Sequence, residues 1–288
     1  MVLKKLFRWA GSVALAMAGT LLVQSCNEVL PVNRGAVYLN TASLYEELGI
    51  TDLMTEELEN SECFVLADLL IYDKSGKLVF GQEIETAMLT ALPLEVSGLA
   101  EGEYTIVAFQ TTVTPAREEA VDWKLEGVED IRTAAVLAID EAPLTFTSAI
   151  GYASTTVSIH GDYFEAFLTP KAMGGIVEIQ IDNFTYDSGY SFMTLGFKPE
   201  NYCYGFYLDP ARSDEDRWVV IEETVKYSKI IGFAYPDKPA GRYFTMTHGE
   251  NIPLTLIGFF GEAGEVIAEG NYTLALGGNF LYYFDLDN

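Results

Sequence analysis

Short runs of apolar and aromatic residues recur along the chain and are separated by residues that favour turns. Two such runs, residues 64–72 and 78–80, flank the segment Asp-Lys-Ser-Gly-Lys at 73–77. An aspartate at the start of the turn and a glycine late in it predict a β-hairpin with a bulge. A further run, residues 103–109, alternates Tyr, Ile and Ala with Thr, Val and Phe. Because both faces of that strand are apolar, we expect it to be central and buried on both sides.

The second half of the chain contains a series of short strand-like runs at a spacing near ten residues. They are broken by Gly, Pro, Asn and Asp, which is typical of a β-sandwich or barrel. The expected strands of this series are 155–159, 163–168, 176–184, 191–197, 204–208, 218–225, 229–235, 242–247, 254–260, 266–267, 272–276 and 280–286, and a further strand is expected near the N-terminus at 36–40. Weak helical patterns appear in residues 41–62. An acidic stretch, 115–142, is partly compatible with a helix and predicts an excursion off the sandwich.

The pattern therefore predicts a mostly β protein of two tandem β-sandwich domains with short helical excursions. A stretch of small and polar residues near 148–154 is the expected boundary. The N-terminal sandwich would then span residues 36–150 and the C-terminal sandwich residues 151–288, with a short tether at 26–35.

The first 25 residues have the pattern of an export signal. Lys4, Lys5 and Arg8 precede an uncharged apolar run that ends at Ser25-Cys26. This run, about 15 residues, is short for a membrane span but suits the apolar region of a signal peptide. A small residue directly before a cysteine resembles the bacterial lipobox, which implies acylation of Cys26; the alternative is an ordinary signal peptide with an incidental cysteine. Two or three acyl chains would anchor the protein stably. We expect attachment to the outer membrane, at the cell surface or on the periplasmic face.

The charge balance excludes one class of partner. The chain has 17 basic and 42 acidic residues, a net charge of −25. Loss of residues 1–25 would leave 14 basic residues against 42 acidic ones, a formal charge of −28. Nucleic-acid binding depends on neutralising phosphates with cations, so we expect no nucleic-acid partner.

Residues that carry out catalysis are scarce. The two histidines, His160 and His248, each precede a glycine in a turn-like segment and lie outside any metal-binding spacing. No G-x-S-x-G motif occurs. We therefore predict a non-catalytic protein with no catalytic residue, no metal and no cofactor. Beyond Cys26, the chain has only Cys63 and Cys203, which we expect to be buried free thiols.

Two ligand classes compete with simpler explanations. Asp209 and the acidic residues 214–216 offer oxygen donors for calcium, but no EF-hand spacing is present, and we expect a solvated loop. Aromatic residues could instead form a sugar-binding platform, although their alternation also suits core packing. The candidates for that platform are Trp123, Trp218, Tyr202, Tyr204 and Tyr207.

Residues 70–79 (LIYDKSGKLV) and 99–109 (LAEGEYTIVAF), together with the lipobox cysteine, resemble the first domain of the fimbrillin-like lipoproteins of Bacteroidales. That family includes anchor and accessory subunits of type V fimbriae. The resemblance implies tandem transthyretin-like sandwiches, strand exchange between subunits, and other envelope or fimbrial subunits as partners. It implies the function of an anchor or accessory subunit. A surface glycan-binding lipoprotein of a polysaccharide uptake system stays open as the alternative.

Two features bear on the role that the resemblance implies. Stalk subunits of such a family are cut after an arginine, and Arg34 precedes the first expected strand. Only eight residues, 27–34, separate that strand from Cys26, a reach of roughly 26 Å, which favours a retained anchor. At the C-terminus an alternating segment could be a strand that is exchanged with another subunit, or it could complete its own sandwich. Its residues are Phe280, Tyr282, Phe284 and Leu286.

Overall fold

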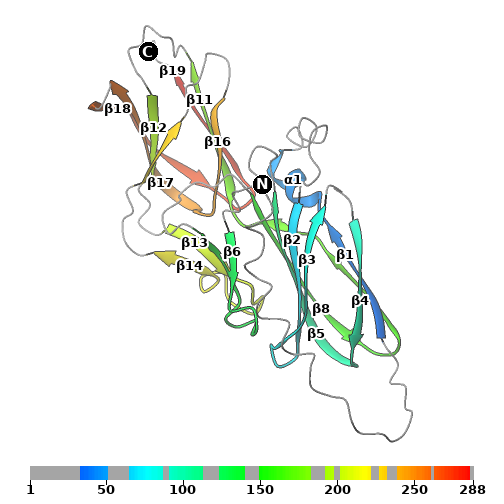
Figure 1. The fold of residues 1–288 in the computed structure, drawn as a ribbon. Helices are drawn as coiled ribbons and strands as arrows, with labels where there is room; N and C mark the ends of the chain where they lie inside the picture. Colours follow the sequence, from blue (N-terminus) through cyan, green and yellow to red (C-terminus); the bar gives the residue numbers. More distant parts are fainter. Residues whose placement is uncertain are drawn as a thin grey trace, which may run out of the picture. The chain divides into compact units, whose positions relative to one another are not determined.

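The computed structural model describes residues 33–50, 65–86, 91–112, 123–139, 149–182, 192–197, 202–221, 227–231, 239–260 and 263–285. The chain from Asn33 onward forms one compact unit. Within the described ranges there are nineteen strands and one helix of six residues, α1 (Ser43–Leu48) (Figure 1). The prediction of a mostly β protein is confirmed.

The first sandwich consists of a three-stranded and a five-stranded sheet. The three-stranded sheet has the order β4 (Ala91–Leu99), β1 (Asn33–Asn40), β9 (Tyr163–Leu168). The five-stranded sheet has the order β10 (Lys171–Ala172), β8 (Ile150–Ile159), β5 (Gly102–Thr112), β2 (Val65–Asp73), β3 (Leu78–Thr86). Strand β1 is antiparallel to β4 and parallel to β9. Val37 and Leu39 from one sheet, and Leu69, Ile71 and Ile106 from the other, are fully buried and form the centre of the core.

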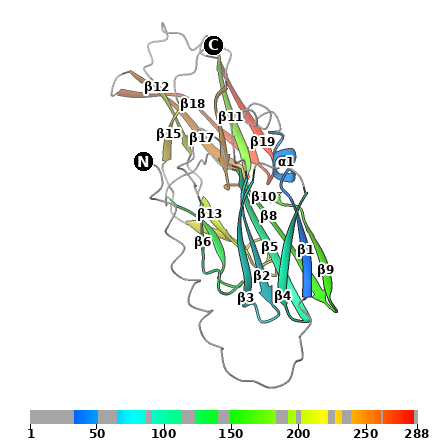
Figure 2. The same cartoon turned by 45° about the vertical axis from the view of Figure 1, so that its right-hand side comes forward.

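The second sandwich repeats this topology. Its three-stranded sheet has the order β16 (Pro239–Thr245), β11 (Gly175–Asp182), β19 (Asn279–Asp285). Its other sheet has the order β15 (Tyr227–Ile231), β12 (Phe192–Phe197), β17 (Gly249–Phe260), β18 (Ala263–Leu274). Strand β11 is antiparallel to β16 and parallel to β19, as β1 is to β4 and β9 (Figure 2). The tandem transthyretin-like arrangement is confirmed.

The strand pairing does not follow the expected boundary at 150/151. Strand β8 pairs with β5 along its whole length, and β9 pairs with β1, so both belong to the first sandwich. The small residues near 151 serve close packing: a Cβ on Gly151 would lie 3.1 Å from Pro170 and 3.2 Å from Leu44 of α1. The strand pairing therefore moves the boundary to the interval between β10 and β11. Strand β1 also begins at Asn33, inside the expected tether.

A third, four-stranded sheet joins segments from the two halves of the chain. Its order is β14 (Trp218–Ile221), β13 (Tyr202–Tyr207), β7 (Ala135–Ala138), β6 (Trp123–Glu126). Strands β6 and β7 leave the first sandwich between β5 and β8, and β13 and β14 leave the second between β12 and β15. Phe206 pairs with Val136 where β13 meets β7. The excursion is confirmed for residues 123–139, which form strands and a turn and contain no helix; the rest of 115–142 lies outside the described residues.

This sheet covers the outer face of the five-stranded sheet. The Tyr152 hydroxyl on β8 donates to the Leu208 carbonyl at 2.7 Å, and the rings of Tyr152 and Phe206 meet edge to face at 5.8 Å. Phe206 is fully buried. Val107 and Phe109, which point away from the sandwich core on β5, are therefore also buried. The expectation that residues 103–109 form a central strand buried on both faces is confirmed.

The hairpin at 73–77 has the expected turn chemistry. The Asp73 carboxylate accepts hydrogen bonds from the Ser75 hydroxyl at 2.6 Å and from the Lys77 and Ser75 amides at 3.0 and 2.8 Å, and these bonds lower the pKa of Asp73. Gly76 has a φ of +87°, the left-handed region that glycine tolerates. The bulge appears as a register shift between Ile71 and Tyr72.

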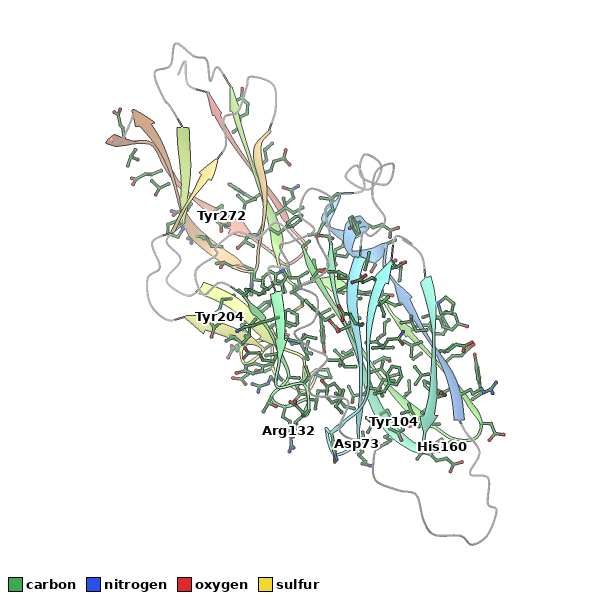
Figure 3. The ribbon with its side chains drawn as sticks, viewed as in Figure 1. Asp73, Tyr104, Arg132, His160, Tyr204 and Tyr272 are labelled. Carbon is green, nitrogen blue, oxygen red and sulfur yellow. The ribbon has the colours of Figure 1, made fainter. Side chains whose placement is uncertain are left out.

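The excursion packs against this hairpin turn. Its Ile131 amide donates to the Gly76 carbonyl at 2.8 Å. Asp73 and Arg132 accordingly lie at the same end of the protein in Figure 3. Arg132 pairs with Asp130, and this hydrogen-bonded pair holds the pKa of Asp130 at about 2.

From the half-buried carboxyl group of Asp68 on β2 we predict that the free energy of unfolding depends on pH. Burial and the charge of Glu83 raise the pKa of Asp68 to about 7. The folded state thus holds a proton that the unfolded state releases near pH 4, so stability should fall as the pH rises from about 4 to 7 and level off above. Asp68→Asn should remove this loss, on the order of 4 kcal/mol, since the pKa difference is about three units and each unit corresponds to about 1.4 kcal/mol.

The measurement is urea unfolding of wild type and variant at pH 5 and pH 8. Glu85→Gln, an exposed acid on β3, serves as the matched control and should keep the wild-type pH dependence. A variant Asp68→Asn that loses as much stability as wild type between the two pH values would contradict the assignment.

A glycine on β1 predicts a steric effect. A Cβ on Gly35 would clash with the Phe164 ring of β9, so the ring must move. Gly35→Ala should lower the free energy of unfolding by about 1–3 kcal/mol, the usual range for overpacking a core. Gly81→Ala on β3 is the control, because its nearest new contact is 3.5 Å away. Equal thermal unfolding midpoints for the two variants would refute the predicted clash.

Candidate functional site

The C-terminal segment lies within the second sandwich. Phe280, Tyr282 and Phe284 occupy β19 and stand in register with Val177, Ile179 and Ile181 of β11. The Phe280 ring lies 5.3 Å from the Tyr272 ring of β18, and Figure 3 labels Tyr272. Leu286 lies outside the described residues. In this structure the segment completes its own sandwich, and its donation to another subunit stays a prediction.

Strand β19 is also the outer strand of its sheet. It pairs with β11 on one side and has no strand partner on the other side among the described residues. Leu281 and Tyr283 point outward and are 51% and 56% exposed. An outer strand with exposed apolar side chains can pair with an additional strand.

Arg34 does not precede the first strand, contrary to the expectation from sequence. It lies inside β1, opposite Ser97 of β4 and Tyr163 of β9, and its amide donates to the Asp162 carbonyl at 3.0 Å. Strand β1 starts before residue 36, its expected first residue, because β4 and β9 both extend far enough to pair with Arg34. Cleavage after Arg34 would leave most of β1 in place. Cys26 lies outside the described residues.

Most of the aromatic residues that were candidates for a sugar platform pack against other side chains. Trp123 is 3% exposed. The Trp218 ring contacts the rings of Phe206 and His248 at 6.2 and 4.5 Å. The Tyr207 ring lies under the Arg212 guanidinium at 3.6 Å. These contacts agree with the core-packing alternative for Trp123 and Trp218, whereas Tyr207 is half-buried beneath Arg212. Tyr204 on β13 is half-buried (Figure 3).

A different set of aromatic residues is exposed, on the outer face of the β4-β1-β9 sheet. Tyr163 and Phe167 on β9 are 57% and 67% exposed. Phe167 stacks on Tyr38 of β1, with ring centroids 4.8 Å apart and planes 10° from parallel. Glu165 lies between Tyr163 and Phe167 along β9. We call Tyr38, Tyr163, Glu165 and Phe167 the outer aromatic surface.

One carboxylate oxygen orders this surface. The Tyr163 and Tyr38 hydroxyls both donate to Glu165 Oε1, at 2.9 and 3.4 Å. The Tyr163 hydrogen bond is the main reason why the pKa of Tyr163 rises to about 12. The alternation in residues 163–168 pointed to a strand, but sequence reasoning missed this surface because the alternation does not say which face is outward.

The remaining polar candidates have structural roles. His160 is exposed just before Gly161, whose φ is +94°, and Nδ1 of His248 lies 3.0 Å from the Met246 carbonyl oxygen. Cys203 is a buried free thiol, as expected, and burial raises its pKa to about 11. Cys63 lies outside the described residues.

The acidic loop has structural contacts of the same kind. The Arg212 guanidinium donates to the Asp216 carbonyl at 3.2 Å, and the Asp209 carboxylate accepts from the Ala211 amide at 2.9 Å. Across the described ranges, no group of three or more His, Cys, Asp or Glu side chains is placed to hold a metal ion. Nor do these ranges contain a helix of the length and apolarity that a membrane span requires.

No protein-family model matches the chain, and no curated protein is significantly similar to it in sequence. Several solved structures are similar in fold. A candidate polysaccharide-binding protein from Bacteroides thetaiotaomicron is 14% identical, with 83% of this chain and 80% of that chain covered and a TM-score of 0.53. A candidate adhesin from Bacteroides ovatus is 12% identical, with coverages of 86% and 79% and a TM-score of 0.52.

The fimbrial anchor protein Mfa2 from Porphyromonas gingivalis is 15% identical, with 83% of each chain covered and a lower TM-score of 0.47. The two more similar structures establish the fold: this chain has the tandem β-sandwich architecture of adhesin-like Bacteroides proteins. The fold that the family resemblance implied, two β-sandwiches in tandem, is confirmed.

Proposed function

We propose that this chain is a non-catalytic, lipid-anchored cell-envelope protein that acts as an anchor or accessory subunit of a fimbria-like assembly. One observation carries the proposal: each sandwich contains its own first and last strands. Strand β1 lies between β4 and β9, and β11 lies between β16 and β19. A subunit that keeps its first strand in place is suited to end an assembly or attach it. A polymerising stalk subunit would have to vacate that position.

The position of β1 also suits attachment to a membrane. Strand β1 begins at Asn33, so six residues separate it from Cys26, a reach of about 20 Å at most when extended. A load on acyl chains at Cys26 would pull on β1. Because β1 is hydrogen-bonded to β4 and β9 along its length, this load would be spread over two strand pairs.

The outer edge of β19 is the proposed contact with other subunits. Main-chain hydrogen bonds from an added strand would give affinity, and alternate side chains would give specificity. Leu281 and Tyr283 are the exposed apolar residues on that strand. The structures of candidate adhesins with this fold support a role at the cell envelope. The similarity to a candidate polysaccharide-binding protein supports the glycan-binding alternative.

The lipid anchor predicts a phase-partition result. Wild type should enter the detergent phase of Triton X-114 and incorporate an alkyne-labelled fatty acid in cells. Cys26→Ser should enter the aqueous phase and lose the label, because the acyl chains supply the apolar area that binds detergent. Cys203→Ser is the control and should behave like wild type. A Cys26→Ser chain that still carries the label would exclude Cys26 as the acylation site.

The subunit contact predicts a loss of co-purifying proteins. The measurement is mass spectrometry of proteins recovered with the detergent-extracted chain from its native membrane. Leu281→Asp combined with Tyr283→Asp should reduce recovery of β-rich fimbrial subunits at least tenfold, because charges on an outer strand oppose strand addition. Val266→Asp on β18, at a position 53% exposed, is the control and should leave recovery unchanged.

Two outcomes would count against the fimbrial role. One is recovery of fimbrial subunits at the same level from the double variant and from wild type. The other is recovery of outer-membrane transporters and glycan-handling lipoproteins alone, which would favour the glycan-binding alternative.

A further inference from the structure

We propose that the outer aromatic surface binds a neutral saccharide, which is a binding activity beyond the proposed attachment role. The surface lies on β1 and β9, at the edge of the first sandwich. Tyr163, Glu165 and Phe167 occupy alternate positions of β9 and therefore all face outward over about 13 Å, at roughly 3.3 Å per residue. The extent of this row suits an oligosaccharide segment.

The apolar part of the site is the open face of the Phe167 ring. One face of this ring is covered by Tyr38, as the nearly parallel planes and the 4.8 Å centroid separation require. The ring nevertheless remains 67% exposed, and β9 is the outer strand of its sheet. The face of an aromatic ring is electron-rich, and it attracts the partly positive C–H groups on one side of a pyranose ring. Stacking on Tyr38 fixes the orientation of Phe167 in advance.

Carboxylates provide the polar part. Glu165 uses Oε1 to accept from the two tyrosines, and among the described residues Oε2 accepts no hydrogen bond. Ala36 of β1 lies between Glu165 of β9 and Glu95 of β4, and Glu95 is exposed on the same face of the sheet as Glu165. Both carboxylates are hydrogen-bond acceptors, and sugar hydroxyl groups are donors. Arg34 and Ser97 continue the face beside Tyr163.

The same charges argue against other occupants. A protein interface would have to remove water from Glu165 and Glu95 at its centre, where charged residues and glutamate in particular are depleted. Nucleic acids, anionic lipids and acidic polysaccharides would be repelled by these carboxylates and by the net charge of −25. A neutral saccharide can instead donate hydroxyl hydrogens to them. The simpler explanation is that Tyr38 and Phe167 are only a cross-strand pair that stabilises the sheet.

The test is affinity electrophoresis of the full, detergent-solubilised lipoprotein in native gels that contain a soluble neutral polysaccharide. The probes are xyloglucan, yeast mannan and galactomannan, with polygalacturonate as the acidic comparison. We expect slowed migration with at least one neutral polysaccharide and none with polygalacturonate. Phe167→Ala should raise the dissociation constant at least tenfold, and Glu165→Gln should weaken binding severalfold.

Two further variants separate stacking from general hydrophobicity and from stability. Phe167→Leu keeps an apolar side chain on the strand but lacks a flat ring, so it should lose binding as Phe167→Ala does, with a thermal unfolding midpoint close to that of wild type. Val266→Ala removes exposed apolar surface from β18 of the second sandwich and should bind like wild type. Absence of binding to every neutral probe would overturn the proposal. So would retention of binding by Phe167→Leu, or an equal loss in Val266→Ala.

Discussion

The central position of β1 in its sheet is the constraint on which the rest of the structure depends. The backbone of β1 is hydrogen-bonded to β4 on one side and to β9 on the other, and the side chains of Val37 and Leu39 lie in the core. Gly35 allows the Phe164 ring to occupy the space that a side chain would take, which locks β1 against β9. Without β1, the sheet would have two exposed edges and a core open to water. The backbone N–H and C=O groups of β4 and β9 that pair with β1 would lose their hydrogen-bond partners.

Both surfaces of functional interest follow from this arrangement and from its repetition. With β1 in the centre, β9 becomes the outer strand and presents Tyr163 and Phe167 on the solvent side. With β11 in the centre of the second sandwich, β19 becomes the outer strand and presents Leu281 and Tyr283. The same topology thus produces two outer strands of different chemistry. Strand β9, which carries a carboxylate between its aromatic rings, suits a saccharide. Strand β19, which is more apolar, suits pairing with another strand.

Features set by local chemistry were predictable from sequence, and features set by distant contacts were not. Asp73 and Gly76 define the hairpin turn through bonds within five residues, so the turn was predicted. The small residue Gly151 was read as part of a linker. It is small because Leu44 of the distant helix α1 packs closely against it, and that contact cannot be seen in a single sequence. The pairing of Phe206 with Val136 joins segments 70 residues apart, and no local pattern encodes it. The outer aromatic surface was missed for a related reason: an alternating strand such as β9 shows two faces, and only the tertiary structure decides which one is buried.

Hydrogen–deuterium exchange of the full chain, purified in detergent, tests the central claim most directly. If β1 is a permanent central strand, the amides of residues 35–39 should exchange as slowly as those of residues 104–109 in β5, the central strand of the facing sheet. Both groups should then open only with unfolding of the sandwich. Rapid exchange in β1 while β5 remains protected would mean that β1 leaves its sheet in the folded protein. The chain would then be a subunit that awaits a strand from a neighbour, which contradicts the role of β1 as a retained strand.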